Sequence, residues 1–214
     1  MYIAIEGVIG AGKTSLAKKL AERLSAKLVL ESFEDNPFLD KFYKDRDRYA
    51  FHTQIHFLLS RYKQLMKLRQ GDLFYENIVA DYIFEKDKIF AYLNLKDEEL
   101  ELYEKIVSII ERQINIPDLI IYLQSTVERL MSNIKHRSRN YEKDMDKNYI
   151  KDLNEGYNYF FFRFRSAKIL IANVADIDFV NNDADFESLV SQILKEEHPQ
   201  LEYFNPGVSK VAGK

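Results

Sequence analysis

The sequence predicts an α/β fold in which a parallel sheet is covered by helices on both faces. Short apolar runs of strand length alternate with longer segments whose apolar residues recur every three or four positions. The first apolar run, residues 2–5, leads into the glycine-rich residues 7–14, and a helical pattern follows directly. The 214 residues, 46% of them hydrophobic, are enough for one such domain.

The composition argues against several classes of function. The chain has no cysteine, which excludes disulfides, thiolate chemistry and cysteine–zinc sites. Its net charge of -3 gives no indication of a nucleic-acid or membrane partner, and no run of about 18 apolar residues is present to cross a bilayer. The first predicted strand begins at residue 2, without room for a signal peptide before it, so we expect a cytoplasmic protein.

The glycine-rich segment fits the phosphate-loop pattern G-x-x-x-x-G-K-[ST]. Its context, a strand before it and an amphipathic helix after it, is the one that this motif requires. Backbone N–H groups of such a loop cradle polyphosphate, the lysine reaches the β- and γ-phosphates, and the Thr14 hydroxyl binds Mg²⁺. Gly10 adds a position that tolerates positive φ. The residues expected to bind the polyphosphate are Gly7, Val8, Ile9, Gly10, Ala11, Gly12, Lys13, Thr14 and Ser15.

Strands and helices alternate along the rest of the chain. The predicted strands cover residues 2–5, 27–31, 77–80, 118–124 and 176–180. The main predicted helices cover residues 15–24, 37–43, 49–69, 97–114, 126–134, 147–173 and 185–197. We therefore expect a P-loop kinase fold with a five-stranded parallel sheet in the order 2-3-1-4-5. Residues 1–198 are expected to form one domain, with 199–214 as a polar, poorly ordered tail.

Two carboxylates follow predicted strands at the edge of the sheet where the phosphate loop lies. Glu31 ends the second strand, and Asp81 follows the third. Ligands of open α/β sheets bind beyond the carboxyl ends of the strands. An acid at the position of Asp81 holds Mg²⁺ directly or through water. For Glu31 alone, a solvated glutamate at a strand end is the alternative.

The long helix over residues 49–69 carries Gln54 and Arg61 on one face, with Phe57 between them. An amide, an aromatic ring and a guanidinium in this arrangement could bind a flat heterocycle. Periodicity by itself favours a solvent-exposed face.

The most basic segment, residues 135–143, follows a predicted helix and contains Arg137 and Arg139. Such a cluster is usually a solvated surface. In a protein with a phosphate loop it also suits a lid, over about residues 135–146, that closes on the transferring phosphoryl group.

Taken together, these segments resemble the deoxyribonucleoside kinase family, and most closely its bacterial deoxyguanosine/deoxyadenosine kinase branch. The resemblance covers residues 2–197 and is carried by IAIEGVIGAGKT, EDNPFLDKFY, IVADY and RSRNYE. It implies transfer of the γ-phosphoryl group of ATP·Mg²⁺ to the 5′-hydroxyl of a purine deoxyribonucleoside. It also implies a homodimer and, as a feedback inhibitor, a deoxynucleoside triphosphate.

The resemblance assigns roles to individual residues. Glu31 would accept the 5′-hydroxyl proton, with Asp81 as a metal ligand or a second acceptor. Lys13, Arg137 and Arg139 would neutralise phosphate charge. The residues implied to bind the nucleoside are Glu31, Tyr43, Gln54, Phe57, Arg61, Asp81, Tyr82, Asp87 and Glu142. Arg137 and the 182–186 loop, with Asp183 and Phe186, would contact the ATP adenine.

One residue departs from the family pattern. Many members carry Glu-Arg-Ser or Asp-Arg-Ser after the third strand, whereas this chain has Asp81-Tyr82-Ile83. The arginine that would steady Glu31 and the phosphates is therefore missing. An alternative is a nucleoside monophosphate kinase of the thymidylate kinase type, but that enzyme needs an additional arginine near Tyr82. A non-catalytic nucleotide-binding protein would not need Glu31, Tyr43, Gln54 and Glu142 together.

Overall fold

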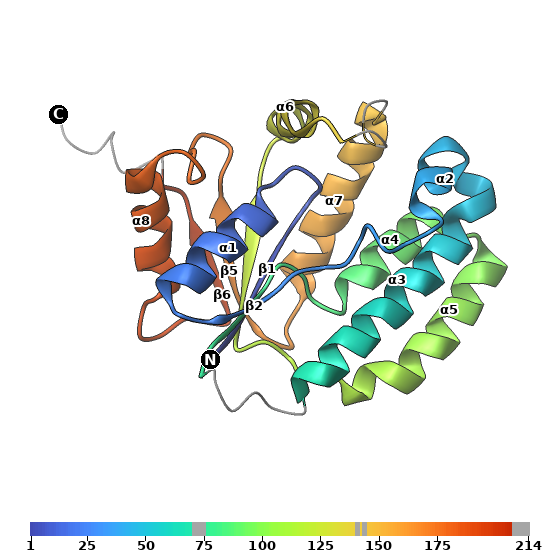
Figure 1. The fold of residues 1–214 in the computed structure, drawn as a ribbon, viewed down its shortest axis with the longest axis horizontal. Coiled ribbons are helices and arrows are strands. Elements are labelled where there is room, and N and C mark those ends of the chain that lie inside the picture. The colour runs from blue at the N-terminus through green and yellow to red at the C-terminus, as the bar shows by residue number, and fades with distance from the viewer. Residues whose placement is uncertain (70–75, 140–141, 143–144, 207–214) are drawn as a thin grey trace.

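The computed structural model describes residues 1–69, 76–139, 142 and 145–206 (Figure 1). Within these ranges, six parallel strands form one sheet in the order β2-β3-β1-β4-β5-β6. The strands are β1 (Tyr2–Gly7), β2 (Lys27–Val29), β3 (Ile78–Ala80), β4 (Leu119–Gln124), β5 (Lys168–Asn173) and β6 (Leu201–Phe204). The predicted α/β class and the order of the first five strands are confirmed, whereas the predicted number of strands is wrong by one.

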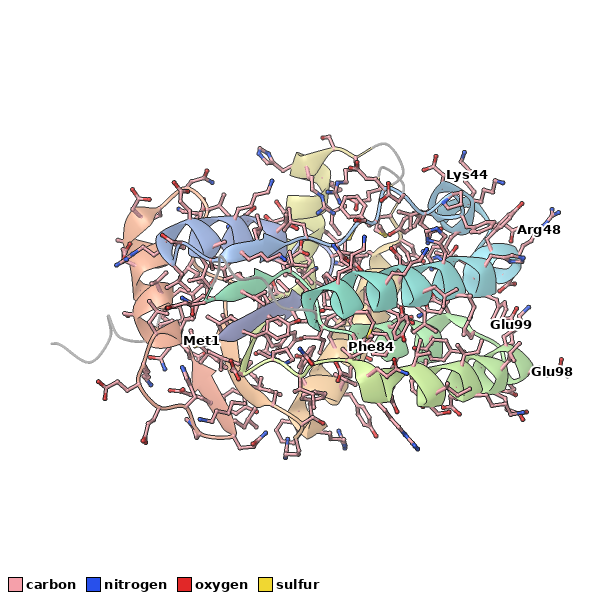
Figure 2. The ribbon with its side chains drawn as sticks, turned by 60° about the horizontal axis from the view of Figure 1, so that its bottom comes forward. Met1, Lys44, Arg48, Phe84, Glu98 and Glu99 are labelled. Atoms are coloured by element: carbon pink, nitrogen blue, oxygen red, sulfur yellow. The ribbon has the colours of Figure 1, made fainter. Side chains whose placement is uncertain are left out.

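Helices cover both faces of the sheet. They are α1 (Lys13–Arg23), α2 (Leu39–Lys44), α3 (Arg46–Arg69), α4 (Lys86–Asn94), α5 (Asp97–Ile110), α6 (Val127–Arg137), α7 (Lys147–Arg163) and α8 (Asp183–Ile193), with a 3₁₀ turn at Glu111–Gln113. In Figure 1, α1 and α8 lie on one side of the sheet and α7 on the other, with α3, α4 and α5 grouped beyond α7. Figure 2 shows Lys44 and Arg48 at the same outer end of this helical group as Glu98 and Glu99, where α3 and α5 begin. Within the described ranges, no helix is long and apolar enough to span a membrane.

The core lies between the central strands and the helices on each side. Leu16 and Leu20 of α1 are fully buried on one face. On the other face, Tyr122 of β4 stacks on Phe161 of α7 with ring centroids 4.7 Å apart, and Tyr157 is also fully buried. Because β1, β4 and β5 are covered on both faces, their sequences are nearly continuous apolar runs.

Three expectations for the C-terminal third are wrong. The helix predicted over residues 147–173 ends at Arg163, and residues 168–173 form strand β5. The buried apolar residues of that strand continue the aromatic-rich helical pattern, so periodicity did not separate them. Residues 176–180 form a loop instead of a strand. The expected tail contributes β6, whose backbone completes the sheet beside β5, and residues 207–214 lie outside the described part of the chain.

Candidate functional site

The phosphate loop joins β1 to α1 and has the backbone geometry that its glycines permit. Gly10 and Gly12 have φ angles of +88° and +91°, in the left-handed region. A side chain at Gly12 would also place its Cβ 2.7 Å from the Phe179 ring. Both glycines are therefore required for this curl of the backbone, which aims the start of α1 at the space above the loop.

Lys13 is folded back over its own loop. Its Nζ donates to the carbonyl oxygens of Gly7 at 2.8 Å and Val8 at 3.1 Å. Burial, followed by the positive charge of Lys86, lowers the pKa of Lys13 from 10.5 to about 8. An anion in the loop would favour the charged form of this lysine.

Thr14 and Asp81 lie side by side at the loop, as predicted. The Thr14 hydroxyl donates to Asp81 Oδ2 at 2.6 Å, and Asp81 Oδ1 accepts from the backbone N–H of Glu31 at 2.8 Å. Hydroxyl and carboxylate oxygens are the ligands that Mg²⁺ prefers, so this pair fits the expected metal. Asp81 therefore connects the loop directly to the segment that carries Glu31.

Glu31 is held by two cations from two different helices. Arg61 of α3 donates through Nε to Glu31 Oε1 at 2.6 Å, and Lys86 of α4 donates to Oε2 at 2.6 Å. Arg61 also forms a close ion pair with the buried Asp87. Burial alone would raise the pKa of Glu31, but Arg61 and Lys86 outweigh it and lower the pKa to about 2. Glu31 is thus an oriented, ionised carboxylate.

Lys86 is a charged site residue that the sequence analysis did not identify. It stands in the charged run Glu85-Lys86-Asp87-Lys88, which looks like a solvated helix start, yet its exposed fraction is 5%. Tyr82, expected in the substrate site, is wholly buried and donates to Gln64, and Gln64 in turn donates to the Leu30 carbonyl. Through Gln64, the tyrosine therefore supports the Leu30 backbone next to Glu31, without lining the pocket itself.

A pocket on the Glu31 side of the loop brings together most of the residues expected to hold the nucleoside. The predicted residues among those that line it are Ile9, Lys13, Thr14, Glu31, Tyr43, Gln54, Phe57, Arg61, Asp81, Arg137, Arg139 and Glu142. We call this the acceptor pocket. Tyr82 and Asp87 are not part of its lining, because the first lies behind the strand end and the second is screened by Arg61. The amide nitrogen of Gln54 donates to the Asp87 carbonyl at 2.7 Å, and this bond holds the amide at the pocket wall.

The predicted lid joins the acceptor pocket to the space above the loop. Arg137 donates to both carboxylate oxygens of the buried Glu142, at 2.6 and 2.8 Å. Arg139 lies 3.7 Å from the same carboxylate and 4.1 Å from the centre of the Phe33 ring. Residues 140–141 and 143–144 of the expected lid lie outside the described part of the chain.

A second pocket, which we call the donor pocket, lies on the other side of the loop. It is lined by residues 10–15, by Arg137 and Arg139, and by residues 177–181. Gly7, Val8, Asp183 and Phe186 line neither of these pockets, and Ile9 lines the acceptor pocket. Asp183 and Phe186 instead contact Lys19, at 3.6 Å and at 4.4 Å from the ring centre. Asp183 and Phe186 belong to α8, which begins at Asp183. The loop before this helix, residues 177–181, faces the donor pocket instead.

Comparison with known proteins agrees with this geometry. A family model described as deoxynucleoside kinase matches residues 3–198. A deoxyguanosine kinase of Bacillus subtilis is 34% identical over 201 residues, which are 90% of this chain and 95% of that protein. A deoxyadenosine/deoxycytidine kinase of the same organism is 30% identical, over 92% of this chain and 93% of that protein. A solved structure of deoxyadenosine kinase from M. mycoides, with products dCMP and a flexible dCDP bound, superposes with a TM-score of 0.80 at 27% identity, covering 90% of this chain and 98% of that one.

Proposed function

Because the chain belongs to the deoxynucleoside kinase family, we propose that it transfers the γ-phosphoryl group of ATP to the 5′-hydroxyl of a purine deoxyribonucleoside. The observation that carries the proposal is the arrangement of the two pockets. The donor and acceptor pockets share Lys13, Thr14, Arg137 and Arg139. A phosphoryl group leaving ATP on one side would meet Glu31 and an acceptor hydroxyl on the other.

In the proposed reaction, Glu31 accepts the proton of the 5′-hydroxyl as its oxygen attacks the γ-phosphorus. Lys13, Arg137 and Arg139 neutralise charge on the phosphoryl oxygens. Mg²⁺ held by Thr14 and Asp81 would neutralise charge that develops on the β- and γ-phosphates. Positioning of the two reactants supplies most of the rate enhancement, because the γ-phosphoryl needs little covalent assistance.

The remaining lining residues are proposed to hold the nucleoside. Gln54 would hydrogen-bond the base edge and Phe57 would contact the base plane. Tyr43 and Glu142 would bind the sugar 3′-hydroxyl. Glu142 is already paired with Arg137. Binding of the sugar to Glu142 would therefore affect the position of Arg137, which is proposed to contact the donor phosphates.

Three further proposals concern partners, regulation and location. Tyr159 and Phe162 of α7 are 64% and 55% exposed, and this aromatic surface supports a homodimer. A deoxyadenosine kinase from M. mycoides has been solved with dATP bound, which supports feedback inhibition by a deoxynucleoside triphosphate here. The use of ATP, a cytoplasmic metabolite, supports the expected cytoplasmic location.

The purine preference rests on relatives that are named as deoxyguanosine and deoxyadenosine kinases. The test is to measure phosphorylation of the four deoxynucleosides, and of dTMP, at equal concentration with ATP and Mg²⁺. We expect deoxyguanosine or deoxyadenosine to give the highest kcat/KM. Phosphorylation of dTMP alone would indicate a nucleoside monophosphate kinase, and ATP binding without any phosphorylation would indicate a non-catalytic protein. A preference for a pyrimidine deoxynucleoside would contradict only the assignment of the base.

A further inference from the structure

We propose that Lys86 is the positioning residue of Glu31: it holds the carboxylate in the orientation that accepts the 5′-hydroxyl proton. The inference rests on the proposed function, because it takes Glu31 as the base. It assigns a role to a residue outside the four motifs that carry the family resemblance, and it identifies a second cation, besides Arg61, beside Glu31 in a chain with Tyr82 after the third strand.

Burial of the charged Lys86 side chain is unfavourable unless an anionic partner compensates for the lost hydration. Lysine is almost never fully buried without a partner, and the exposed fraction of Lys86 is 5%. Lys86 is also the first residue of α4. The positive end of a helix dipole disfavours a cation there. Its neighbour Lys88, two residues further on, instead pairs with Glu111 and is partly exposed.

What keeps Lys86 inside is its contact with Glu31. Its Nζ lies 2.6 Å from Glu31 Oε2, and it lines the acceptor pocket. The Phe90 ring, one turn along α4, lies 5.9 Å from the same nitrogen and adds a cation–π contact. Glu31 and Phe90, which contact the ammonium, both line the acceptor pocket, and the buried Glu6 adds a second nearby carboxyl that interacts with Lys86 electrostatically.

Two cations from separate helices hold the two oxygens of one carboxylate. Arg61 takes Oε1, and its other side is bound to Asp87, so this guanidinium is anchored in place. Lys86 takes Oε2 from the opposite helix. With only Arg61 present, the carboxylate plane could turn. With both, it is fixed. Oε1 is approached by two Arg61 nitrogens, whereas Oε2 accepts from Lys86 and keeps a lone pair for the substrate hydroxyl.

The third strand itself provides no cation at this place. Tyr82, which follows Asp81, is neutral, and its hydroxyl donates a hydrogen bond to Gln64. Lys86, from the beginning of α4, reaches the carboxylate that Tyr82 does not reach. The positive charge at Oε2 of Glu31 thus comes from the helix that follows the strand, and the positive charge at Oε1 comes from Arg61 of α3.

Four variants test this role: Lys86→Met, Lys86→Arg, Glu31→Gln and the double variant Glu31→Gln/Lys86→Met. Lys88→Met is the matched control, because it removes a lysine of the same helix that lines neither pocket. The measurements are kcat and the KM for deoxyguanosine and deoxyadenosine, with thermal unfolding as the check on folding. Lys86→Gln, which keeps a donor without the charge, replaces the methionine variant if that protein does not fold.

We expect Lys86→Met to lower kcat on the order of 10²-fold, the effect of a misplaced reacting group, with little change in the nucleoside KM. Lys86→Arg should recover most of the rate, and Lys88→Met should leave it unchanged. The double variant should be no slower than Glu31→Gln, since Lys86 acts through that carboxylate.

Normal kcat in Lys86→Met, or losses that multiply in the double variant, would overturn the inference. A lowered melting temperature with normal kcat would likewise show a structural role only. Normal turnover of Glu31→Gln would instead remove Glu31 as the base, a failure of the proposed function that is read from that variant alone.

Discussion

Acid should destabilise this fold measurably through Glu31. Burial acts to raise the pKa of this carboxyl, but Arg61 and Lys86 outweigh it, so the pKa falls from 4.5 to about 2. A carboxylate whose folded pKa lies below its unfolded pKa stabilises the fold above pH 4.5, and this contribution is lost as the pH falls toward 2. The difference between the two values corresponds to about 3 kcal/mol at neutral pH, of which about 1 kcal/mol should be lost by roughly pH 3.5.

The assay is urea unfolding of the wild type and of Glu31→Gln, followed by circular dichroism between about pH 7 and pH 3.5. The variant removes the anion between Arg61 and Lys86 at every pH and leaves Arg61 paired with Asp87, which lowers its stability by an amount that does not depend on Glu31 titration. The informative quantity is therefore the difference in slope: the wild type should lose about 1 kcal/mol more than the variant on acidification. Glu101→Gln, at an exposed residue paired with Lys105, is the control and should follow the wild-type profile. Parallel profiles of wild type and Glu31→Gln would refute the assignment of Glu31 as a carboxylate stabilised by two cations.

Two further substitutions test the packing around the site. Arg61→Met leaves the buried Asp87 without its cation, and we expect a loss of about 3–5 kcal/mol in urea unfolding; a loss below about 1 kcal/mol would show that Asp87 has another partner. Gly12→Ala forces a left-handed backbone on an alanine and places its Cβ 2.7 Å from the Phe179 ring. We expect it to weaken ATP binding by about tenfold or more in titration calorimetry, and an unchanged Kd would mean that the loop rearranges freely.

The phosphate-loop side of the site could be predicted because the residues that bind the polyphosphate are consecutive in the sequence. The spacing of Gly12, Lys13 and Thr14 specifies an anion site, and the alternation of strands and helices places Glu31 and Asp81 at the same edge of the sheet. Sequence order placed Thr14, Glu31 and Asp81 only at the same edge of the sheet. The structure adds the direct contacts: the Thr14 hydroxyl and the Glu31 backbone N–H both donate to Asp81.

The rest depended on contacts between distant segments. Lys86 stands in a run of charges that has the composition of a solvated helix start, and only the packing of α4 against Glu31 shows that it is buried. Strand β6 has four residues in a polar segment, and pairing with β5 alone defines it. Strand β5 follows an aromatic-rich helix, and a strand buried on both faces has no alternation that would mark its beginning.

In the proposed reaction, Glu31 receives the proton on the acceptor side of the residues that the two pockets share. The most direct test is a rapid-quench measurement of the first turnover of Glu31→Gln with ATP·Mg²⁺ and deoxyguanosine or deoxyadenosine. We predict phosphoryl transfer roughly 10²–10⁴-fold slower than in the wild type, the range for loss of a general base, with ATP affinity retained. A first turnover at the wild-type rate would contradict the account and would direct attention to Asp81 as the proton acceptor.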